Sequence, residues 1–335
     1  MTLPVWHPES LAARMPFLER RADLTRAVRG FFHDRGYREV ETPYAVPAPG
    51  EEVHLRAFST SREHPDGTRE NLWLHTSPEF AMKRLLVAQS GPIFQFARVW
   101  RNGEASALHA PEFTMLEWYR PGSNMSSLIE ETTTLMRSVL PPIVHCRGVT
   151  TDLSHCERLT VADAFTRYAG VDLLAIGDDA AALAAAANVR LRDKEDWEDL
   201  FFRLLLERIE PRIGREHPTF LTHWPAAQAA LARRDPADPR VAERFELYVC
   251  GIELANAFVE LTDPAEQRAR FLVERQRRHA MHGPDWDLDE DFLAALGHGM
   301  PPSAGIALGF DRLAMIASGA HKIGQVLWLP AADLM

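Results

Sequence analysis

Residues 98–120 read RVWRNGEASALHAPEFTMLEWYR, and this stretch is the part of the sequence that decides the fold. Strand-forming residues lie on both sides of GEASALHAP, so the pattern predicts two antiparallel strands joined by an extended loop. Three arginines, three glutamates and four aromatic residues share these twenty-three positions. A hairpin at the surface does not need so many aromatic residues, and a strand in the core does not need so many charged ones. The mixture therefore indicates a hairpin that binds a ligand.

The segments before this hairpin read as a helix, short strands and a second helix. Residues 16–36 show helical spacing of apolar residues and end at Gly36, and 37–43 alternate like a strand. Residues 53–60 and 72–75 also read as strands. A helix follows, with Thr76 or Ser77 as its cap and Pro78 and Glu79 in its first turn.

The segments after the hairpin mix helices with strands. Helices are expected over 124–140, over most of 160–215 and over 263–282, with a connector at 141–158 and a polar loop at 232–240. Strands are expected at 218–225 and within 241–261, and 304–319 reads as a glycine-rich turn or strand that enters a helix. This mixture favours an α+β fold, an antiparallel sheet flanked by helices. We expect one domain over residues 1–335, with 141–215 as a mostly helical insertion or connector.

Composition narrows the class of protein. The 335 residues carry a net charge of −10, which argues against broad, nonspecific nucleic-acid binding. No apolar run is long enough to span a bilayer, and the N-terminus lacks the order of a secretory signal, so we expect a cytoplasmic protein. Three cysteines fit a reducing compartment, and the pairs at 145–146 and 155–156 lack the usual zinc spacing.

Three residues of the hairpin suit a nucleotide. Arg101, at a strand end, has the planar fork that binds a phosphoryl group through two hydrogen bonds. Phe113 offers a face on which a purine stacks, and His109 lies in the loop within reach of phosphates. The alternative is that Phe113, Leu116 and Trp118 are core residues, which we favour for Leu116 and Trp118.

Two further segments carry charges of interest. Glu246, Glu253 and Glu260 recur at seven-residue steps; carboxylates near a triphosphate usually hold Mg²⁺, and otherwise they are surface charges. In GIALGFDRLAMI, a glycine-rich turn enters a helix close to Arg312, which is typical of an anion site but also of an ordinary helix start.

Together these segments resemble the class II aminoacyl-tRNA synthetases, in particular the lysyl branch. ADLTRAVRGFFHDRGYREVETP resembles their motif 1, RVWRNGEASALHAPEFTMLEWY motif 2 and GIALGFDRLAMI motif 3, while TSPEFAMKRLL and GIELANAFVELTD match lysyl-specific stretches. Motif 1 begins near residue 20, so we expect no anticodon-binding barrel before it. The phrases PFLERR, GPIFQ, MLEWYRP, AERFELY and GIELAN resemble a narrower family, the elongation factor P–(R)-β-lysine ligases.

Ala307 supports the narrower family, because lysyl synthetases usually have glycine there and the ligases alanine. One methyl group changes an amino-acid pocket by only about 1–3 kcal/mol. The resemblance implies a cytoplasmic homodimer that uses ATP and Mg²⁺, activates (R)-β-lysine or lysine as an adenylate and transfers it to a lysine of elongation factor P, with no tRNA and no membrane.

The resemblance also implies a role for each site residue. Arg101 bridges the substrate carboxylate and the α-phosphate, and Arg312 holds the γ-phosphate end and covers the adenine opposite Phe113. The other implied residues are Asn102, Gly103, Glu104, His109, Leu254 and Gly309 for the nucleotide; Glu246 and Glu253 for Mg²⁺; Glu117, Glu260 and Tyr119 for the side-chain ammonium; Ser77, Glu79 and Asn256 for the other amine and the carboxylate; and Ala307 in the amino-acid pocket.

Two positions depart from the family pattern. Gly103 occupies the place of a glutamate that reads the adenine amino group, and Ala110 replaces an asparagine. Two other functions therefore stay open: a minimal lysyl-tRNA synthetase-like enzyme that uses α-lysine, and a non-catalytic synthetase-like protein that binds an amino acid and a partner.

Overall fold

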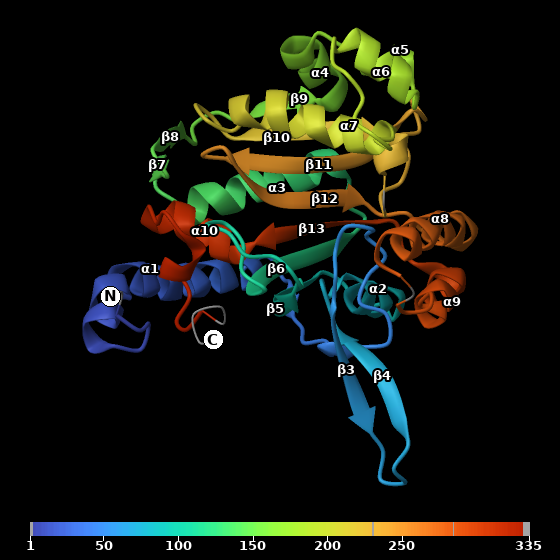
Figure 1. Cartoon of the computed structure of the whole chain (residues 1–335). Coiled ribbons are helices and arrows are strands. Elements are labelled where there is room, and N and C mark those ends of the chain that lie inside the picture. Colours follow the sequence, from blue (N-terminus) through green and yellow to red (C-terminus); the bar gives the residue numbers. More distant parts are fainter. Residues whose placement is uncertain (1–2, 230, 284, 331–335) are drawn as a thin grey trace. The chain divides into compact units, whose positions relative to one another are not determined.

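The computed structural model describes residues 3–229, 231–283 and 285–330, and the chain divides into two compact units (Figure 1). Unit 1 comprises Met1–Asn124 and Glu260–Met335, and unit 2 comprises Met125–Val259. The single domain expected over residues 1–335 stays a prediction. Among the described residues, no helix is both long and apolar enough to cross a membrane.

Unit 1 contains four strands in the order β1 (Arg38–Glu39), β5 (Ile93–Trp100), β6 (Glu112–Pro121) and β13 (Ser303–Gly309). The pairs β5–β6 and β6–β13 are antiparallel, and β1 is parallel to β5. A smaller sheet consists of β2 (Ala45–Val46), β4 (Arg69–Leu74) and β3 (Phe58–Glu63). The helices of this unit are α1 (Pro8–His33), α2 (Glu79–Val87), α8 (Pro264–His282), α9 (Glu290–Gly299), α10 (Phe310–Ser318) and the 3₁₀ turn η4 (Ile323–Gln325).

One face of the β5–β6 hairpin packs on helices. Phe32 of α1 stacks on Phe94 at 4.8 Å between ring centroids and contacts Trp118 at 5.1 Å, and Phe310 of α10 meets Phe96 at 4.9 Å. Burial of each such ring contributes about 1.5–3 kcal/mol. Because side chains alternate along a strand, the residues between these aromatics point to the opposite face.

A buried arginine joins the three segments that resemble motifs 1, 2 and 3. Arg21 of α1 forms a salt bridge with Asp311 at the start of α10 and donates to Thr114 Oγ1 of β6 at 3.0 Å. Asp311 Oδ2 also accepts from the backbone N–H of Thr114 at 2.9 Å. Arg312 is the next residue, so this network fixes the start of α10 relative to the β5–β6 hairpin.

Unit 2 contains four strands in the order β12 (Ile252–Val259), β11 (Val241–Val249), β10 (Thr219–Pro225) and β9 (Glu157–Thr160). The pair β9–β10 is parallel and the other two pairs are antiparallel. A separate hairpin consists of β7 (Ile143–Cys146) and β8 (Val149–Asp152). The helices are α3 (Met125–Val139), α4 (Val161–Ala169), α5 (Leu173–Ile176), α6 (Ala180–Ala186), α7 (Trp197–Leu204), the π-helix η1 (Leu205–Ile209) and the 3₁₀ turns η2 (Glu210–Arg212) and η3 (Ala226–Gln228).

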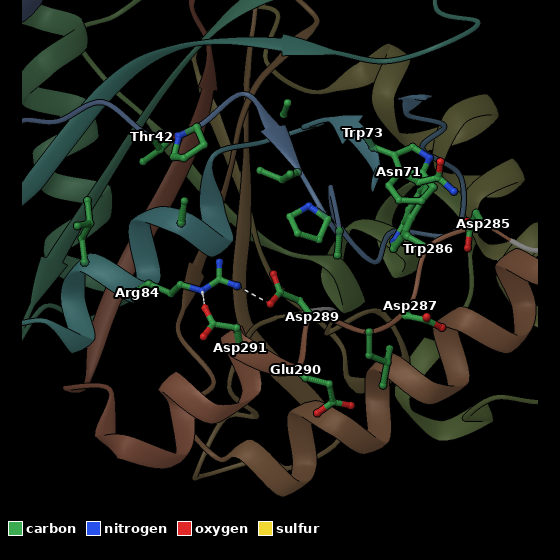
Figure 2. Close-up of a pocket in the computed structure, with 18 of the residues that line it drawn as sticks. Thr42, Asn71, Trp73, Arg84, Asp285, Trp286, Asp287, Asp289, Glu290 and Asp291 are labelled. Carbon is green, nitrogen blue, oxygen red and sulfur yellow. Dashed lines mark hydrogen bonds and ion pairs between the residues drawn. The ribbon is translucent and has the colours of Figure 1, made fainter. Parts of the chain in front are cut away.

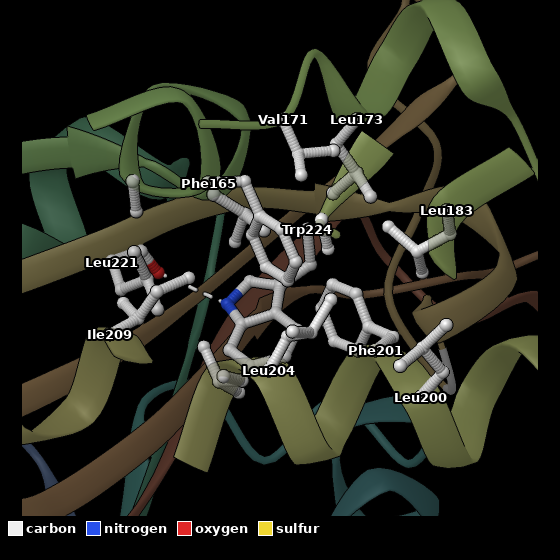
Figure 3. Packing of buried hydrophobic residues seen from close by; sticks show 14 of the residues in the cluster. Phe165, Val171, Leu173, Leu183, Leu200, Phe201, Leu204, Ile209, Leu221 and Trp224 are labelled. Atoms are coloured by element: carbon white, nitrogen blue, oxygen red, sulfur yellow. Dashed lines mark hydrogen bonds between the residues drawn. The ribbon is translucent and has the colours of Figure 1, made fainter. Parts of the chain in front are cut away.

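The core of unit 2 is built around Trp224, whose side chain is fully buried (Figure 3). Phe165 of α4 and Phe201 of α7 stack on each other at 5.0 Å, and Phe201 meets the Trp224 ring at 5.9 Å. The indole N–H donates to the Leu221 carbonyl at 3.1 Å, so the one polar atom of this ring is satisfied inside the core.

The central predictions about the fold are confirmed. The hairpin at 98–120 forms with its long loop, residues 160–215 are mostly helical, and helices lie at 125–139 and 264–282 as expected. The outer pairs β1–β5 and β9–β10 are parallel, so the strands are not all antiparallel. The segment 241–261 is a hairpin that turns at Cys250 and Gly251, where φ is +54° and +67°.

Several boundaries were wrong. The first helix begins at Pro8, where His7 caps it by accepting from the backbone N–H of Glu9 at 3.3 Å. The strand expected over 37–43 is reduced to the two residues of β1. The connector 141–158 contains β7, β8 and the start of β9, and α9 and the strand β2 were not foreseen.

The strand expected at 53–60 begins only at Phe58. The preceding loop is held by side chains, since Trp286 Nε1 donates to the Gly50 carbonyl at 2.9 Å and His282 Nε2 lies 3.1 Å from the Val53 carbonyl. Within 53–57, the Val53 carbonyl contacts His282 and the Arg56 carbonyl accepts from the backbone N–H of Asn102, so the alternating pattern produces no strand there.

Candidate active site

The predicted site residues lie in both units. Unit 1 contains Ser77, Glu79, Arg101, Asn102, Gly103, Glu104, His109, Phe113, Glu117, Tyr119, Glu260, Ala307, Gly309 and Arg312. Unit 2 contains Glu246, Glu253, Leu254 and Asn256.

Four charged residues of unit 1 form a buried group that we call the acid cluster: Glu79, Lys83, Glu117 and Glu260. All are buried, and Glu117 is fully so. Lys83 Nζ lies 2.5 Å from Glu79 Oε1 and 2.5 Å from Glu260 Oε2. Oε1 of Glu260 has no hydrogen-bond partner among the described residues. Three carboxyl groups therefore face one ammonium group, so the cluster is short of positive charge.

Neighbouring residues fix the Glu117 carboxylate in place. Ser77 Oγ donates to Oε1 at 2.6 Å, and the Tyr119 hydroxyl donates to Oε2 at 2.8 Å. Ser77 Oγ in turn accepts from the backbone N–H of Glu79 at 3.1 Å, although the N-cap residue of α2 is Pro78 and not Thr76 or Ser77 as expected. Two strand positions and a helix start thus converge on one carboxylate.

The glycine opposite Tyr119 allows the Tyr119 ring and the Glu260 carboxyl group to pack directly on the backbone of β13. Gly305 of β13 pairs with Tyr119 in the ladder. A Cβ atom at residue 305 would overlap the Tyr119 ring and lie 2.6 Å from Glu260 Oε1. Any larger residue would therefore displace Tyr119 or Glu260 and disturb the acid cluster.

The pKa values of the cluster reflect this shortage of positive charge. Burial, assisted by the negative charge of Glu79, raises the pKa of Glu117 to about 8. Burial also raises the pKa of Glu260, although Lys83 opposes the change. Burial disfavours the Lys83 ammonium, but Glu260 and Glu79 outweigh it and raise the pKa of Lys83. A bound cation would replace the protons that the carboxyl groups otherwise keep.

The sequence analysis missed two members of this region. Lys83 was visible as the residue four positions after Glu79 on one helix face, the spacing of an intrahelical ion pair. Glu52 lies on the loop before β3; burial and then Glu79 raise its pKa, while Arg101 opposes the change. Glu52 is thus close enough to Glu79 and Arg101 to interact electrostatically with both.

Arg101 lies at the end of β5 beside Phe113. Its guanidinium carbon is 5.2 Å from the Phe113 ring centroid, and Nη1 lies 3.8 Å from Glu104 Oε1. The buried Nε has no hydrogen-bond partner among the described residues. Buried donors are rarely left unsatisfied in folded proteins, so this nitrogen fits an anionic ligand.

In the loop after Arg101, the side chain of Arg56 lies next to Gly103, which has no side chain of its own. Gly103 has φ of +86°, and a Cβ atom there would overlap the Arg56 guanidinium. Asn102 is fixed through its backbone N–H, which donates to the Arg56 carbonyl at 2.7 Å. Arg56 therefore occupies the space beside residue 103, where the family pattern has a glutamate.

Arg312 and His109 are brought together. Nη2 of Arg312 lies 2.7 Å from His109 Nε2, and His109 Nδ1 lies 2.8 Å from Ser106 Oγ. Gly309 precedes α10 as its N-cap residue. The residue that resembles the motif 3 arginine is therefore in contact with the loop that begins at Arg101.

Ala307 lies opposite Glu117 in the ladder between β13 and β6. It packs against the cluster of Ala97, Val99 and Met115, which Phe113 also contacts. Its methyl group and the Phe113 ring thus border the same apolar surface.

Unit 2 brings the predicted Glu246, Glu253 and Asn256 together at the β11–β12 hairpin. Glu246 pairs with Asn256 in the ladder, and Glu253 pairs with Tyr248. A bulge places Leu254 between two register pairs, a geometry that frees backbone groups from the ladder. Burial and then the charge of Glu253 raise the pKa of Glu246, which shows that the two carboxyl groups interact.

The carboxylates of Glu246 and Glu253 fit a hard cation whose remaining ligands come from the substrate and from water. Among the described residues, no three His, Cys, Asp or Glu side chains gather as a metal site. Mg²⁺ is often held by one or two carboxylates plus substrate phosphates and water, so a pair is sufficient when a nucleotide is present.

A cavity of about 950 Å³ in unit 1 lies elsewhere (Figure 2). Arg84 and Leu85 of α2 line it, whereas Glu79 and Lys83 are not among its lining residues. Besides Glu41, its acidic residues are paired with arginines: Asp289 and Asp291 with Arg84, Asp285 with Arg278, Asp287 with Arg275 and Glu290 with Arg268. The cavity is therefore not an uncompensated acidic site like the acid cluster.

Comparisons with known proteins identify the family of the chain. A family model described as tRNA synthetases class II (D, K and N) matches residues 12–333. A protein of Haemophilus influenzae (strain PittGG) is 45% identical over 324 residues, covering 96% of each chain, and one of Hamiltonella defensa is 43% identical over 330 residues, covering 97% of each. A third, from Klebsiella pneumoniae, is 44% identical over 327 residues, covering 96% of each. All three are named elongation factor P–(R)-β-lysine ligase. The chain belongs to the class II tRNA synthetase family and, within it, to the elongation factor P–(R)-β-lysine ligases.

Proposed function

We propose that this protein uses ATP to activate (R)-β-lysine as an adenylate and transfers it to a lysine ε-amine of elongation factor P. The observation that carries the proposal is the acid cluster of unit 1. With its carboxyl groups ionised, it has an excess of two negative charges over Lys83, and (R)-β-lysine carries two ammonium groups.

The charge of the cluster supports a diamine and disfavours a neutral side chain. An isolated buried carboxylate is costly unless a cation or hydrogen bonds compensate it. Glu117 and Glu260 are proposed for the side-chain ammonium, with Tyr119 orienting Glu117 through its hydroxyl. Ser77 and Glu79, with Asn256 of unit 2, are proposed for the second amine and the carboxylate.

The nucleotide contacts follow from the loop after β5 and the start of α10. Arg101 is proposed to bridge the substrate carboxylate and the α-phosphate, because its Nε lacks a partner and its guanidinium lies beside Phe113. The adenine is proposed to lie between Phe113 and Arg312, with His109 near the phosphates and the backbones of Leu254 and Gly309 lining the nucleotide. Asn102, Gly103 and Glu104 complete this loop.

Mg²⁺ is proposed to be held by Glu246 and Glu253 together with ATP phosphates. Each Glu246 oxygen already accepts one hydrogen bond, from Arg244 or Tyr248, and a carboxylate oxygen has a further lone pair for a cation. The ion would neutralise phosphate charge.

The first reaction needs positioning and charge neutralisation more than proton transfer. A carboxylate oxygen of (R)-β-lysine attacks the α-phosphorus of ATP in line, and pyrophosphate leaves. In the second reaction the acceptor amine attacks the carbonyl carbon of the adenylate, a C–N bond forms, AMP leaves and the amine loses a proton. The residues proposed above for the amino acid and the nucleotide hold (R)-β-lysine and ATP during the first of these steps.

We further propose a cytoplasmic homodimer of a single catalytic domain that acts without tRNA. The use of α-lysine stays an alternative, since α-lysine also carries two ammonium groups and Ala307 changes the pocket by one methyl group. Pyrophosphate exchange with α-lysine and with β-lysine separates the two substrates. The non-catalytic alternative fails if either amino acid supports exchange.

A substitution in the acid cluster tests the substrate assignment. Glu260→Gln removes a charge from the cluster and is expected to weaken amino-acid activation by about 2–5 kcal/mol, as for other broken buried charge pairs. Glu195→Gln is the matched control, because Glu195 forms a salt bridge with Arg203 in unit 2, outside the proposed site. Unchanged adenylate formation by the Glu260→Gln variant would refute the proposed role.

The transfer reaction is tested by the intact mass of elongation factor P after incubation with the enzyme, ATP and (R)-β-lysine. We expect the mass to increase by one lysyl residue, and to stay unchanged for an elongation factor P whose acceptor lysine is alanine. No increase in the first sample, together with measurable pyrophosphate exchange, would place the acceptor elsewhere.

A further inference from the structure

One buried arginine of unit 2 contacts two of the proposed ligand-binding residues at once. Arg244 of β11 donates from Nη2 to Glu246 Oε1 at 2.8 Å and from Nε to Asn256 Oδ1 at 3.1 Å. Its Nη1 donates to the Gln228 carbonyl at 2.7 Å. Every nitrogen of the guanidinium group thus has an acceptor, and the side chain is 10% exposed.

The surrounding core fixes this guanidinium in one position. Its central carbon lies 4.1 Å from the centroid of the Trp224 ring, and Trp224 is itself held in the core of unit 2 (Figure 3). A bulge between β10 and β11 places two residues, Glu243 and Arg244, opposite the single residue His223. Bulges re-aim side chains, and this one lies directly at Arg244.

Glu246 has a second donor that does not reach Asn256. The Tyr248 hydroxyl lies 2.7 Å from Glu246 Oε2 and 3.1 Å from Glu210 Oε1. Arg244 therefore acts on both Glu246 and Asn256, whereas Tyr248 acts on Glu246 alone. This difference allows the two effects to be separated by experiment.

We propose that Arg244 is a positioning residue that couples binding of the metal–nucleotide to binding of the amino acid. The proposal rests on the proposed function, in which Glu246 holds Mg²⁺ and Asn256 binds the amino acid. The rigid guanidinium group of Arg244 sets the orientation of the Glu246 and Asn256 side chains before the substrates bind. Neither binding step then has to order these side chains. A displacement of the guanidinium disturbs both sites together.

Three variants separate coupling from structural damage. Arg244→Lys keeps the charge but loses the planar fork. Tyr248→Phe removes one donor to Glu246 and leaves Asn256 untouched. Arg240→Lys is the matched control, because Arg240 lies near the same strand and pairs with Asp238 at the surface.

Two measurements are made on each full-length variant. Calorimetric titration with a non-hydrolysable ATP analogue at several Mg²⁺ concentrations gives metal–nucleotide affinity without catalysis. Pyrophosphate exchange gives KM and kcat for (R)-β-lysine. Arg244→Lys is expected to weaken metal–nucleotide binding and to raise KM, each by about 10–100-fold, as for other residues that orient metal ligands. Tyr248→Phe is expected to weaken metal–nucleotide binding without raising KM. Arg240→Lys is expected to change neither quantity.

Asn256→Ala keeps the test decisive if Arg244→Lys fails to fold. Asn256 is not a proposed metal ligand, so a loss of metal–nucleotide affinity of at least about 3-fold in this variant supports coupling through Arg244. An Arg244→Lys or Asn256→Ala variant that alters one binding step and not the other overturns the proposal. Absence of exchange in the unaltered protein would instead refute the proposed function, while the calorimetric comparison would still test the positioning role.

Discussion

The two units contain buried carboxylates that are compensated in different ways. In the acid cluster of unit 1, three carboxyl groups share Lys83, and one Glu260 oxygen has no hydrogen-bond partner among the described residues. In unit 2, both Glu246 oxygens accept from the protein's own donors, Arg244 and Tyr248. The arrangement in unit 1 leaves negative charge that a bound cation can neutralise. The arrangement in unit 2 fixes the Glu246 carboxylate before any ligand binds.

The largest expected effect comes from removing the cation of the acid cluster. Lys83→Met leaves three buried carboxyl groups without a counter-charge, and we expect the free energy of unfolding to fall by about 3–5 kcal/mol at pH 8. The loss shrinks at pH 6, because carboxyl groups with raised pKa values then hold protons. Urea unfolding at both pH values measures this effect.

The double variant Glu79→Gln/Lys83→Met serves as its control. Removal of one charge of each sign should recover part of the lost stability. Equal unfolding free energies for Lys83→Met and the unaltered protein at both pH values would show that the cluster is not short of positive charge.

The next largest effect concerns the close packing of Gly305 against the acid cluster. Gly305→Ala places a methyl group against the Tyr119 ring and Glu260 Oε1. We expect adenylate formation to fall by about 100-fold or more and stability by about 1–3 kcal/mol, as for an overpacked core. Steady-state pyrophosphate exchange and urea unfolding report the two changes.

Gly297→Ala is the matched control for this substitution. Gly297 lies in α9, and no atom lies within 4 Å of a Cβ built there. The change should leave activity unaltered and stabilise the helix by up to about 1 kcal/mol. Similar activity losses in both variants would argue that glycine removal, and not the Tyr119 contact, is responsible.

A smaller effect is the pH dependence of stability that Glu117 causes. Because its folded-state pKa is raised to about 8 from 4.5, the folded protein holds this proton more tightly than the unfolded chain. Its contribution to stability is therefore lost as the pH rises from about 4.5 to 8, at no more than about 1.4 kcal/mol per pH unit.

The comparison of the unaltered protein with Glu117→Gln isolates this dependence. We expect the stability difference between them to change with pH over that window in the absence of ligand, and to change less when a diamine is bound. Parallel stability curves for the two proteins would mean that Glu117 is ionised in the ligand-free fold.

The smallest effect is expected in the loop after Arg101. Gly103→Ala imposes φ of +86° on alanine and displaces the exposed Arg56 guanidinium, for a cost of about 1 kcal/mol. We expect KM for ATP to change by only a few-fold, measured by pyrophosphate exchange. A loss of all nucleotide binding would show that the position of Arg56 is essential.

Patterns of sequence predicted the parts of the fold that depend on local repetition. The β5–β6 hairpin, the helix at 264–282 and the helical segment of unit 2 all follow from apolar spacing and turn residues. The loop at 53–57 could not be predicted in this way, because His282 contacts its Val53 carbonyl and Trp286 binds the Gly50 carbonyl just before it, and both side chains lie more than two hundred residues later in the chain.

In the candidate site, too, some residues were identified from the sequence, whereas the roles of others depend on distant parts of the chain. Resemblance indicated Arg101, His109 and Arg312, and the structure places His109 and Arg312 in contact. The roles of Lys83 and Arg244 were not predicted, since each depends on partners in other elements. Lys83 joins Glu79 to Glu260 across most of the chain, and the position of Arg244 depends on a bulge that no local pattern reveals.

The central claim is that the acid cluster requires a guest with two ammonium groups. Pyrophosphate exchange with (R)-β-lysine, compared with an analogue in which a methyl group replaces the terminal ammonium, tests it most directly. The account predicts exchange with (R)-β-lysine and a kcat/KM at least about 10³-fold lower for the analogue, because buried carboxylates would be left unpaired. Comparable kcat/KM values for the two compounds would contradict it.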